Sequence, residues 1–145
     1  MKRAGFTMIE LIFVIVILGI LAAVAIPKLS ATRTDAEVSK MAADTATLIS
    51  DLGAYYTSKG TFDAADITNI TNFDTGITSP LGNGDHFDIT DSDSNACLTV
   101  KFNNVKDGNV TVAKGTGVSS VCTSVNTATK NLRKTYLFGG SHIKR

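Results

Sequence analysis

A single carboxylate, Glu10, stands near the start of an otherwise uncharged apolar segment. The segment runs from Phe6 to Ile26 and is twenty-one residues long. A helix of about 20 apolar residues crosses a hydrocarbon layer about 30 Å thick, so this segment is long enough to span a membrane. An acid inside such a helix is costly in lipid and marks a specific partner or function. The chemistry expected of Glu10 is therefore pairing with a positive charge.

A short basic leader precedes the apolar segment. It comprises Met1 to Gly5, carries Lys2 and Arg3, and ends in a small residue. Positive charges beside a membrane helix hold that end in the cytoplasm. The residues after Pro27 are then expected on the other side of the membrane.

Three interpretations fit this leader and the apolar segment. The first is a conventional secretory signal, cut after the small-x-small triplet at residues 23–25. The second is an uncleaved single-pass anchor. The third is a short leader cut between Gly5 and Phe6, which leaves the apolar helix on the mature chain. Glu10 disfavours the first two, because neither gains from an acid at that position. Pro27, two residues after the cut at Ala25, also disfavours the first.

The N-terminal sequence resembles the prepilin signature of type IV pilins and type II secretion pseudopilins. The resemblance lies in Gly5-Phe6-Thr7-Met8-Ile9-Glu10-Leu11, followed by the apolar helix and Pro27, and it covers about residues 2–29. It implies that a prepilin peptidase cuts after Gly5 and methylates the new amine of Phe6. It also implies that Glu10 acts in subunit assembly, where it meets the Phe6 amine of a neighbouring subunit.

The helix is expected to continue far beyond the apolar segment. From Lys28 to Tyr56, apolar residues recur at steps of three and four, with charged residues between them. This pattern predicts one helix over about residues 6–57. Gly19 weakens a helix by about 1 kcal/mol relative to Ala, and Pro27 lacks the N–H that an interior position uses. Because the resembled family often loosens this zone in the filament, a helix break between Gly19 and Pro27 is expected there.

The remainder of the chain is typical of a small antiparallel sheet. Strand-like runs are predicted at 86–90, 97–103, 109–113, 118–122 and 135–138, with a long loop over 60–85 and a short helix within 125–134. The predicted fold is α+β and pilin-like, with the second half of the long helix packed on the sheet. The expected domains are a cleaved leader (1–5), a transmembrane or filament-core helix (6–27) and a periplasmic head (28–145).

Cys97 and Cys122 are the two cysteines of the chain. In an exported domain, two cysteines most simply form one disulfide. A pair of buried free thiols is the alternative.

A polar run after the first predicted strand places oxygen-bearing side chains at alternate positions: Asp91, Asp93 and Asn95. This resembles the first half of a calcium loop. An EF-hand needs Gly at its sixth position and Glu at its twelfth, where this chain has Ala96 and Phe102. The run therefore fails as an EF-hand and is interpreted as a polar turn, so no metal or other cofactor is expected. A looser calcium site is the alternative, because some secretion pseudopilins bind calcium in such loops.

Positive charge gathers toward the C-terminus, although the net charge of the whole chain is only +1. A solvated face is the simpler interpretation, and a DNA-contacting patch is the alternative, since phosphate binding needs clustered cations. The residues concerned are Lys130, Arg133, Lys134, His142, Lys144 and Arg145. Neither the Cys/His spacing nor any Ser/His/Asp grouping matches a zinc or nucleophilic site, so the chain is not expected to be an enzyme.

The sequence thus predicts a structural subunit, a prepilin or pseudopilin of a type II secretion or type IV pilus-like filament. Such a filament supports protein secretion or DNA uptake. The alternative is a minor pilin whose head binds DNA or a surface. Expected partners are copies of the chain, other pilin-like subunits, the prepilin peptidase, an inner-membrane assembly platform, membrane lipid and, in the alternative, nucleic acid. The expected location is the bacterial inner membrane with a periplasmic head, and then a periplasmic or cell-surface filament.

Overall fold

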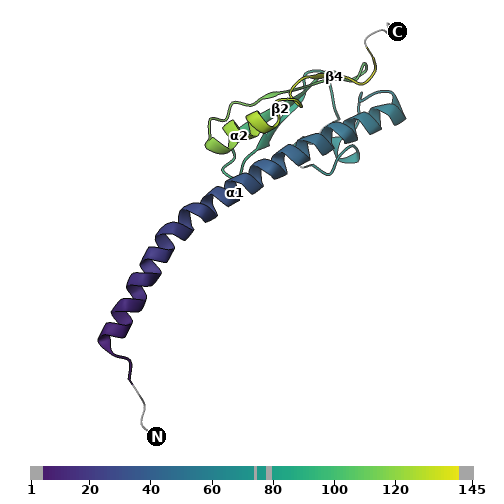
Figure 1. Ribbon diagram of the computed structural model, residues 1–145. Coiled ribbons are helices and arrows are strands. Elements are labelled where there is room, and N and C mark those ends of the chain that lie inside the picture. The colour runs from purple at the N-terminus through teal and green to yellow at the C-terminus, as the bar shows by residue number, and fades with distance from the viewer. Residues whose placement is uncertain (1–4, 74, 78–79, 141–145) are drawn as a thin grey trace. The chain divides into compact units, whose positions relative to one another are not determined.

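One helix of 52 residues, α1 (Met8–Lys59), dominates the computed structural model, which describes residues 5–73, 75–77 and 80–140. The chain divides into two compact units, Met1–Ala36 and Glu37–Arg145. We call them the N-terminal unit and the head. The first half of α1 forms the N-terminal unit, and its second half belongs to the head together with a four-stranded antiparallel sheet and a second helix (Figure 1). The predicted α+β, pilin-like layout is confirmed.

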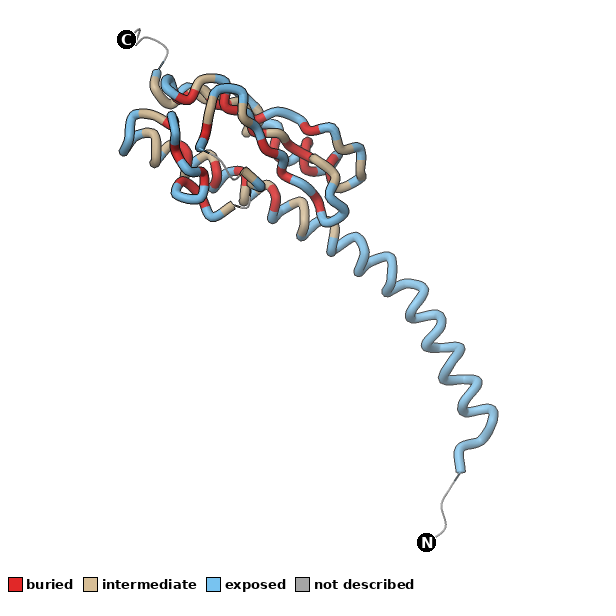
Figure 2. The backbone as a smooth tube through the Cα atoms, turned by 180° about the vertical axis from the view of Figure 1, so that it is seen from behind, coloured by how far each residue is buried: buried red, intermediate tan, exposed pale blue. Residues whose placement is uncertain are grey.

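The α1 residues of the N-terminal unit are exposed on nearly every side (Figure 2). The most apolar window of α1 has a mean hydropathy of 3.1, and none of it is buried within the chain. By length and composition α1 can therefore cross a membrane. Gly19 and Pro27 both lie within α1, which is assigned as helix through both positions. The helix break expected between them in the filament stays a prediction.

The second half of α1 buries one stripe of side chains in the head. Met41, Thr45, Leu48 and Leu52 recur at steps of four, three and four, and all are buried. The Thr45 hydroxyl donates to the Met41 carbonyl oxygen at 2.7 Å, which satisfies its polar group inside the core. After α1 ends, Gly60 adopts a φ of +73°, a left-handed conformation that favours glycine. The amphipathic pattern thus predicted the buried face of α1.

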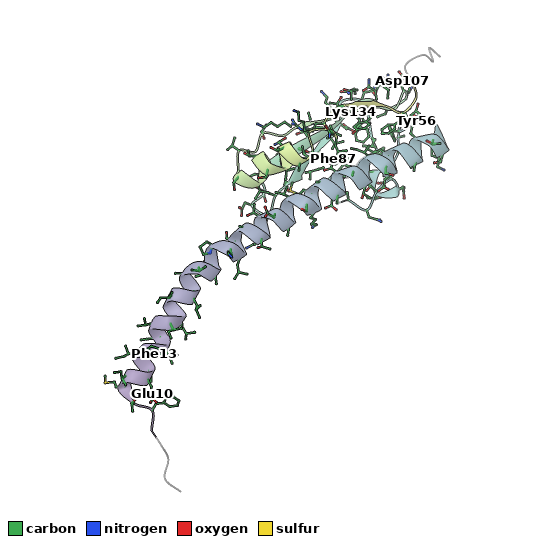
Figure 3. All side chains as sticks on the ribbon, viewed as in Figure 1. Glu10, Phe13, Tyr56, Phe87, Asp107 and Lys134 are labelled. Atoms are coloured by element: carbon green, nitrogen blue, oxygen red, sulfur yellow. A yellow bond between two sulfur atoms is a disulfide. The ribbon has the colours of Figure 1, made fainter. Side chains whose placement is uncertain are left out.

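The long connection from 60 to 85 is anchored by Phe62, whose side chain is fully buried. Four aromatic rings surround it, with centroids 5.2–6.1 Å away: Tyr55, Tyr56, Phe102 and Phe138. Figure 3 shows Tyr56 on the side of α1 that faces the sheet. A short 3-10 helix, η1 (Ile67–Asn69), follows, and the Asp66 carboxylate caps it by accepting the Thr68 N–H. Phe62 therefore joins α1, the loop and the sheet in one core.

The sheet is an antiparallel meander in the order β1-β2-β3-β4. Its strands are β1 (His86–Thr90), β2 (Ala96–Asn104), β3 (Asn109–Lys114) and β4 (Thr135–Leu137). In β2, Leu98, Val100 and Phe102 are buried, while Lys101 between them is exposed. Val100 pairs with Phe87 of β1 and Val112 of β3. The period of two predicted from the sequence therefore sets which face of the sheet packs on α1.

The predicted strand at 118–122 is wrong, because these residues lead into a helix, α2 (Ser120–Ala128). Ser119 begins the helix: its side-chain oxygen accepts the Cys122 N–H at 3.0 Å. Val118, which suggested a strand, has 91% of its surface exposed. The helix predicted within 125–134 also ends earlier than expected, at Ala128. The N-cap favours a helix over a strand here, because it satisfies a backbone N–H group at the start of the helix. A prediction from β-propensity takes no account of such a cap.

Replacing Phe62 by Ala should destabilise the head by about 3–5 kcal/mol, because it removes the ring that joins α1 to the sheet. The measurement is urea unfolding of the full chain in detergent, followed by tyrosine fluorescence. All three tyrosines lie in the head, so the signal reports that unit alone. Val118→Ala is the control, with an expected change within about 0.5 kcal/mol. Equal stability of the two variants would contradict the assigned core.

Candidate functional site

Glu10 lies in the first turn of α1, in the N-terminal unit (Figure 3). Its carboxylate is held by Thr7. Glu10 Oε2 accepts the Thr7 backbone N–H at 2.8 Å and the Thr7 hydroxyl at 2.7 Å. The Glu10 backbone N–H in turn donates to Thr7 Oγ1 at 3.3 Å. This reciprocal arrangement is a capping box, in which a Thr and a Glu three residues apart satisfy each other's helix-end N–H groups. Within the subunit, the carboxylate already has polar partners.

The capping box decides where α1 begins. Gly5, Phe6 and Thr7 lie outside the helix, which starts at Met8 and not at Phe6 as predicted. The Gly5–Phe6 peptide bond is therefore in non-helical chain, and the Phe6 side chain is 85% exposed. A protease needs an extended, accessible segment, so this bond suits cleavage. Thr7 was not assigned a role from the sequence, although its signal, Thr-x-x-Glu, is present at residues 7–10.

Phe6 and Glu10 lie close together on the surface of the N-terminal unit. With Leu11, Val14 and Ile15 they border one shallow hollow, whose wall is otherwise apolar. The structure thus brings together the two residues that the sequence assigns to assembly. Their roles in cleavage, methylation and assembly stay predictions.

The head holds a second polar centre, around Asp91 at the end of β1. The Asp91 carboxylate is buried, and it accepts the backbone N–H groups of Asp93 at 3.0 Å and Asn95 at 2.8 Å. The Asn95 side-chain amide and the Ser119 hydroxyl donate to it as well, the hydroxyl at 2.7 Å from Oδ2. Asp91 therefore fastens the β1–β2 loop to the first turn of α2.

These donors control the charge of Asp91. Burial by itself would raise the pKa of the carboxyl group, but the hydrogen bonds from Ser119, Asn95 and Asp93 outweigh it and hold the pKa below its ordinary value of 3.8. The carboxylate is thus ionised at neutral pH. Calcium binding at Asp91, Asp93 and Asn95 stays a prediction. An ion ligated by both Asp91 and Asn95 would have to replace the amide hydrogen bonds between them.

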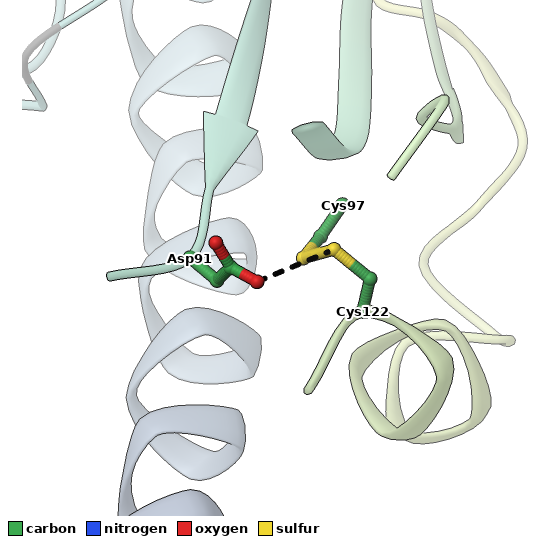
Figure 4. A group of neighbouring side chains, drawn as sticks. All are labelled: Asp91, Cys97 and Cys122. Carbon is green, nitrogen blue, oxygen red and sulfur yellow. Dashed lines mark hydrogen bonds between the residues drawn. A yellow bond between two sulfur atoms is a disulfide. The ribbon is translucent and has the colours of Figure 1, made fainter. Parts of the chain in front are cut away.

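Cys97 and Cys122 form a disulfide, as the sequence predicted. It joins β2 to α2 next to Asp91 (Figure 4). Among the described residues, Asp91 and these two cysteines make the group whose ligand atoms lie near enough to hold a metal, within 4.8 Å of one another. Both sulfurs are committed to the disulfide and carry no thiolate for a metal.

The predicted basic cluster is represented by Lys130, Arg133 and Lys134, because His142, Lys144 and Arg145 lie outside the described residues. Arg133 Nη2 donates to the Asn126 carbonyl oxygen at 3.0 Å. Lys134 Nζ lies over the Tyr136 ring, 5.2 Å from its centroid. Two of these three side chains, Arg133 and Lys134, therefore contact other residues of the head.

A model of the prokaryotic N-terminal methylation motif matches residues 1–26. This motif is the signature of type IV pilins and pseudopilins, so the match confirms the resemblance noted in the sequence. Searches of curated proteins and of solved structures return no match to the chain.

The signature and the long apolar helix together define the class of protein. The signature supports a type IV pilin-like or pseudopilin-like subunit, and the N-terminal part of α1 is long and apolar enough to anchor it in a membrane. The signature implies processing by a prepilin peptidase, assembly with other pilin subunits and a structural rather than enzymatic role.

Replacing Asp91 by Asn should destabilise the head at neutral pH, and the deficit should shrink in acid. Because the folded-state pKa is lowered, the unfolded chain takes up the proton first as the pH falls. The stability that Asp91 contributes is therefore complete above about pH 5 and is lost as the pH drops through 3.8 toward the folded value. Urea unfolding of wild type and variant from pH 7 to pH 3 measures the difference.

Asp93→Asn is the matched control for this experiment, because Asp93 is exposed and lies two residues away. The free energy of unfolding of this variant should change with pH as that of the wild type does, over the whole range. A deficit of Asp91→Asn that stays constant from pH 7 to pH 3 would contradict the role of the ionised carboxylate.

Proposed function

We propose that this chain is a structural subunit of a type II secretion or type IV pilus-like filament. Its mature form begins at Phe6, is N-methylated there, and waits in the inner membrane with its head in the periplasm. An assembly platform in that membrane then moves it into the growing filament. Subunit docking pairs Glu10 with the Phe6 amine of a neighbour. The observation that carries the proposal is the methylation motif at residues 1–26, which includes the apolar first part of α1, a segment that the described residues leave uncovered.

The charge pair explains why an acid is tolerated in this helix. Methylation leaves a secondary amine, which is protonated at neutral pH. A lone carboxylate is expensive in lipid, whereas a paired one avoids much of that cost. The capping box supports this charge pairing, because the Thr7 N–H and hydroxyl groups hydrogen-bond the Glu10 carboxylate before a neighbouring subunit arrives. Both hydrogen bonds from Thr7 go to Glu10 Oε2, so the other carboxylate oxygen, Oε1, is left for the incoming amine.

The described part of the head favours a structural subunit over a DNA-binding minor pilin. Arg133 and Lys134, which belong to the basic cluster, make their contacts with Asn126 and Tyr136 of the same chain. A phosphate-binding role for these two side chains would compete with those contacts. The finer assignment, to secretion or to DNA uptake, remains part of the proposal.

The intact mass of the membrane-extracted protein should equal a chain that begins at Phe6 with one added methyl group. The physical reason is that the Gly5–Phe6 bond lies in non-helical chain ahead of α1. Mass spectrometry of the protein from membranes measures it directly. A chain that begins at Ile26 would identify a secretory signal instead, and a chain that retains the leader would identify a plain anchor. Either result would overturn the proposed processing.

Replacing Glu10 by Gln should leave membrane insertion intact and reduce filament incorporation at least about tenfold, because the amide cannot pair with the Phe6 ammonium group. The measurement compares the subunit in the membrane fraction with that in sheared filaments. Asp35→Asn is the matched control, since it removes one exposed carboxylate of α1 beyond the apolar segment. Normal incorporation of Glu10→Gln would refute the pairing.

A further inference from the structure

The disulfide lies in a closed environment within the head. Cys97 and Cys122 have no exposed surface. The loop between β3 and α2 lies directly on the bond: a Cβ added at Gly117 would stand 2.8 Å from Cys122 Sγ. Gly115 is as close to β2, where a Cβ would stand 2.2 Å from the Ala96 carbonyl oxygen. Glycine is therefore required at both positions, and the loop restricts the approach of other molecules to the sulfurs.

Two oxygen atoms approach Cys122 Sγ from the β1–β2 loop. Asp91 Oδ2 lies 3.9 Å from it (Figure 4), and the Asn95 carbonyl oxygen lies 3.6 Å from it. A disulfide sulfur carries no hydrogen, so neither contact is a hydrogen bond in the oxidised head. The Asp91 carboxylate therefore gains no hydrogen bond from this sulfur. Its donors, Asn95 and Ser119 among them, nevertheless hold it there.

We propose that Asp91 protects the Cys97–Cys122 disulfide by slowing thiol–disulfide exchange. Exchange proceeds by attack of a thiolate on one sulfur, and it expels the other sulfur as a thiolate. Negative charge therefore enters and leaves in the same step. A fixed carboxylate about 4 Å away repels that charge more strongly than it would in water, since the dielectric screening inside a protein is weaker than in water.

Attack on either sulfur brings negative charge near the Asp91 carboxylate. A thiolate that attacks Cys97 expels the thiolate of Cys122, which then faces Asp91 Oδ2. A thiolate that attacks Cys122 expels the thiolate of Cys97, whose sulfur also lies within 4.8 Å of the carboxylate. The effect concerns the rate of exchange and not the reduced product, because a protonated Cys122 thiol can donate to Asp91.

The chemistry balances with a monothiol reagent. The first thiolate forms a mixed disulfide with one cysteine and releases the other cysteine as a thiolate. A second thiolate attacks the reagent's sulfur in the mixed disulfide, forms the reagent's own disulfide and releases the second cysteine. Two reagent thiols supply the two electrons, and each released cysteine takes a proton from water. This protection is a property of the head and does not depend on whether the chain assembles into filaments.

The test compares two small reagents on the full-length chain in detergent. Mercaptoethanol attacks as an anion, whereas cysteamine attacks as a thiolate whose ammonium group offsets the charge. Aliquots are alkylated over time, and reduction is read from intact mass, at reagent concentrations where the rate is proportional to reagent. Asp91→Asn should be reduced by mercaptoethanol about tenfold faster than wild type, and the gain with cysteamine should be about threefold. The rate ratio of the two reagents therefore rises in this variant.

Two further variants separate the effect of the Asp91 charge from the effect of looser packing around the disulfide. Ser119→Ala removes a donor to Asp91 and the N-cap of α2 but keeps the carboxylate. Asp93→Asn removes an exposed carboxylate of the same loop. Both should keep the wild-type rate ratio, whatever their absolute rates. An unchanged ratio in Asp91→Asn, or an equal rise in Ser119→Ala, would overturn the proposal, because loosening alone accelerates both reagents alike.

Discussion

The first half of α1 exposes apolar side chains on nearly every side, and the residues that the structure describes leave them uncovered. Burial of apolar surface is the main favourable term in folding, so this helix needs either lipid or other helices of the same kind. The proposed function supplies both in turn, a membrane first and a bundle of like helices in the filament afterwards. The division of the chain into two compact units follows from this constraint, since only the second half of α1 packs within its own subunit.

Glu10 fits this constraint because its charge has a partner at each stage. In the subunit, Thr7 and Glu10 satisfy each other's helix-end N–H groups, and the helix begins two residues later than the sequence predicts. In the proposed filament, the carboxylate meets the Phe6 ammonium group of a neighbour. A carboxylate that is held in place, rather than free to rotate, loses less conformational entropy when that partner arrives.

The head solves a different problem, that of joining short elements into one stable unit. Phe62 connects α1 to the sheet through four neighbouring rings, while the disulfide and Asp91 connect the sheet to α2. These two centres use different interactions. The first is apolar and insensitive to pH, whereas the second depends on an ionised carboxylate and on an oxidised cysteine pair. The head is therefore expected to respond to acid and to thiols through its α2 side.

The sequence by itself determined the features that rest on local pattern. The spacing of Gly5, Phe6 and Glu10 identified the signature, and the steps of three and four identified the buried face of α1. The alternation in β2 and the cysteine count led to the sheet face and the disulfide. The structure, and not the sequence pattern, showed that residues 120–128 form a helix, because hydrophobic periodicity does not report the local cap that Ser119 provides. Only the tertiary structure decided that Asp91 lies beside Cys122. The Ser119 hydroxyl binds this carboxylate 28 residues earlier in the chain, and such a contact arises only when the chain folds in three dimensions.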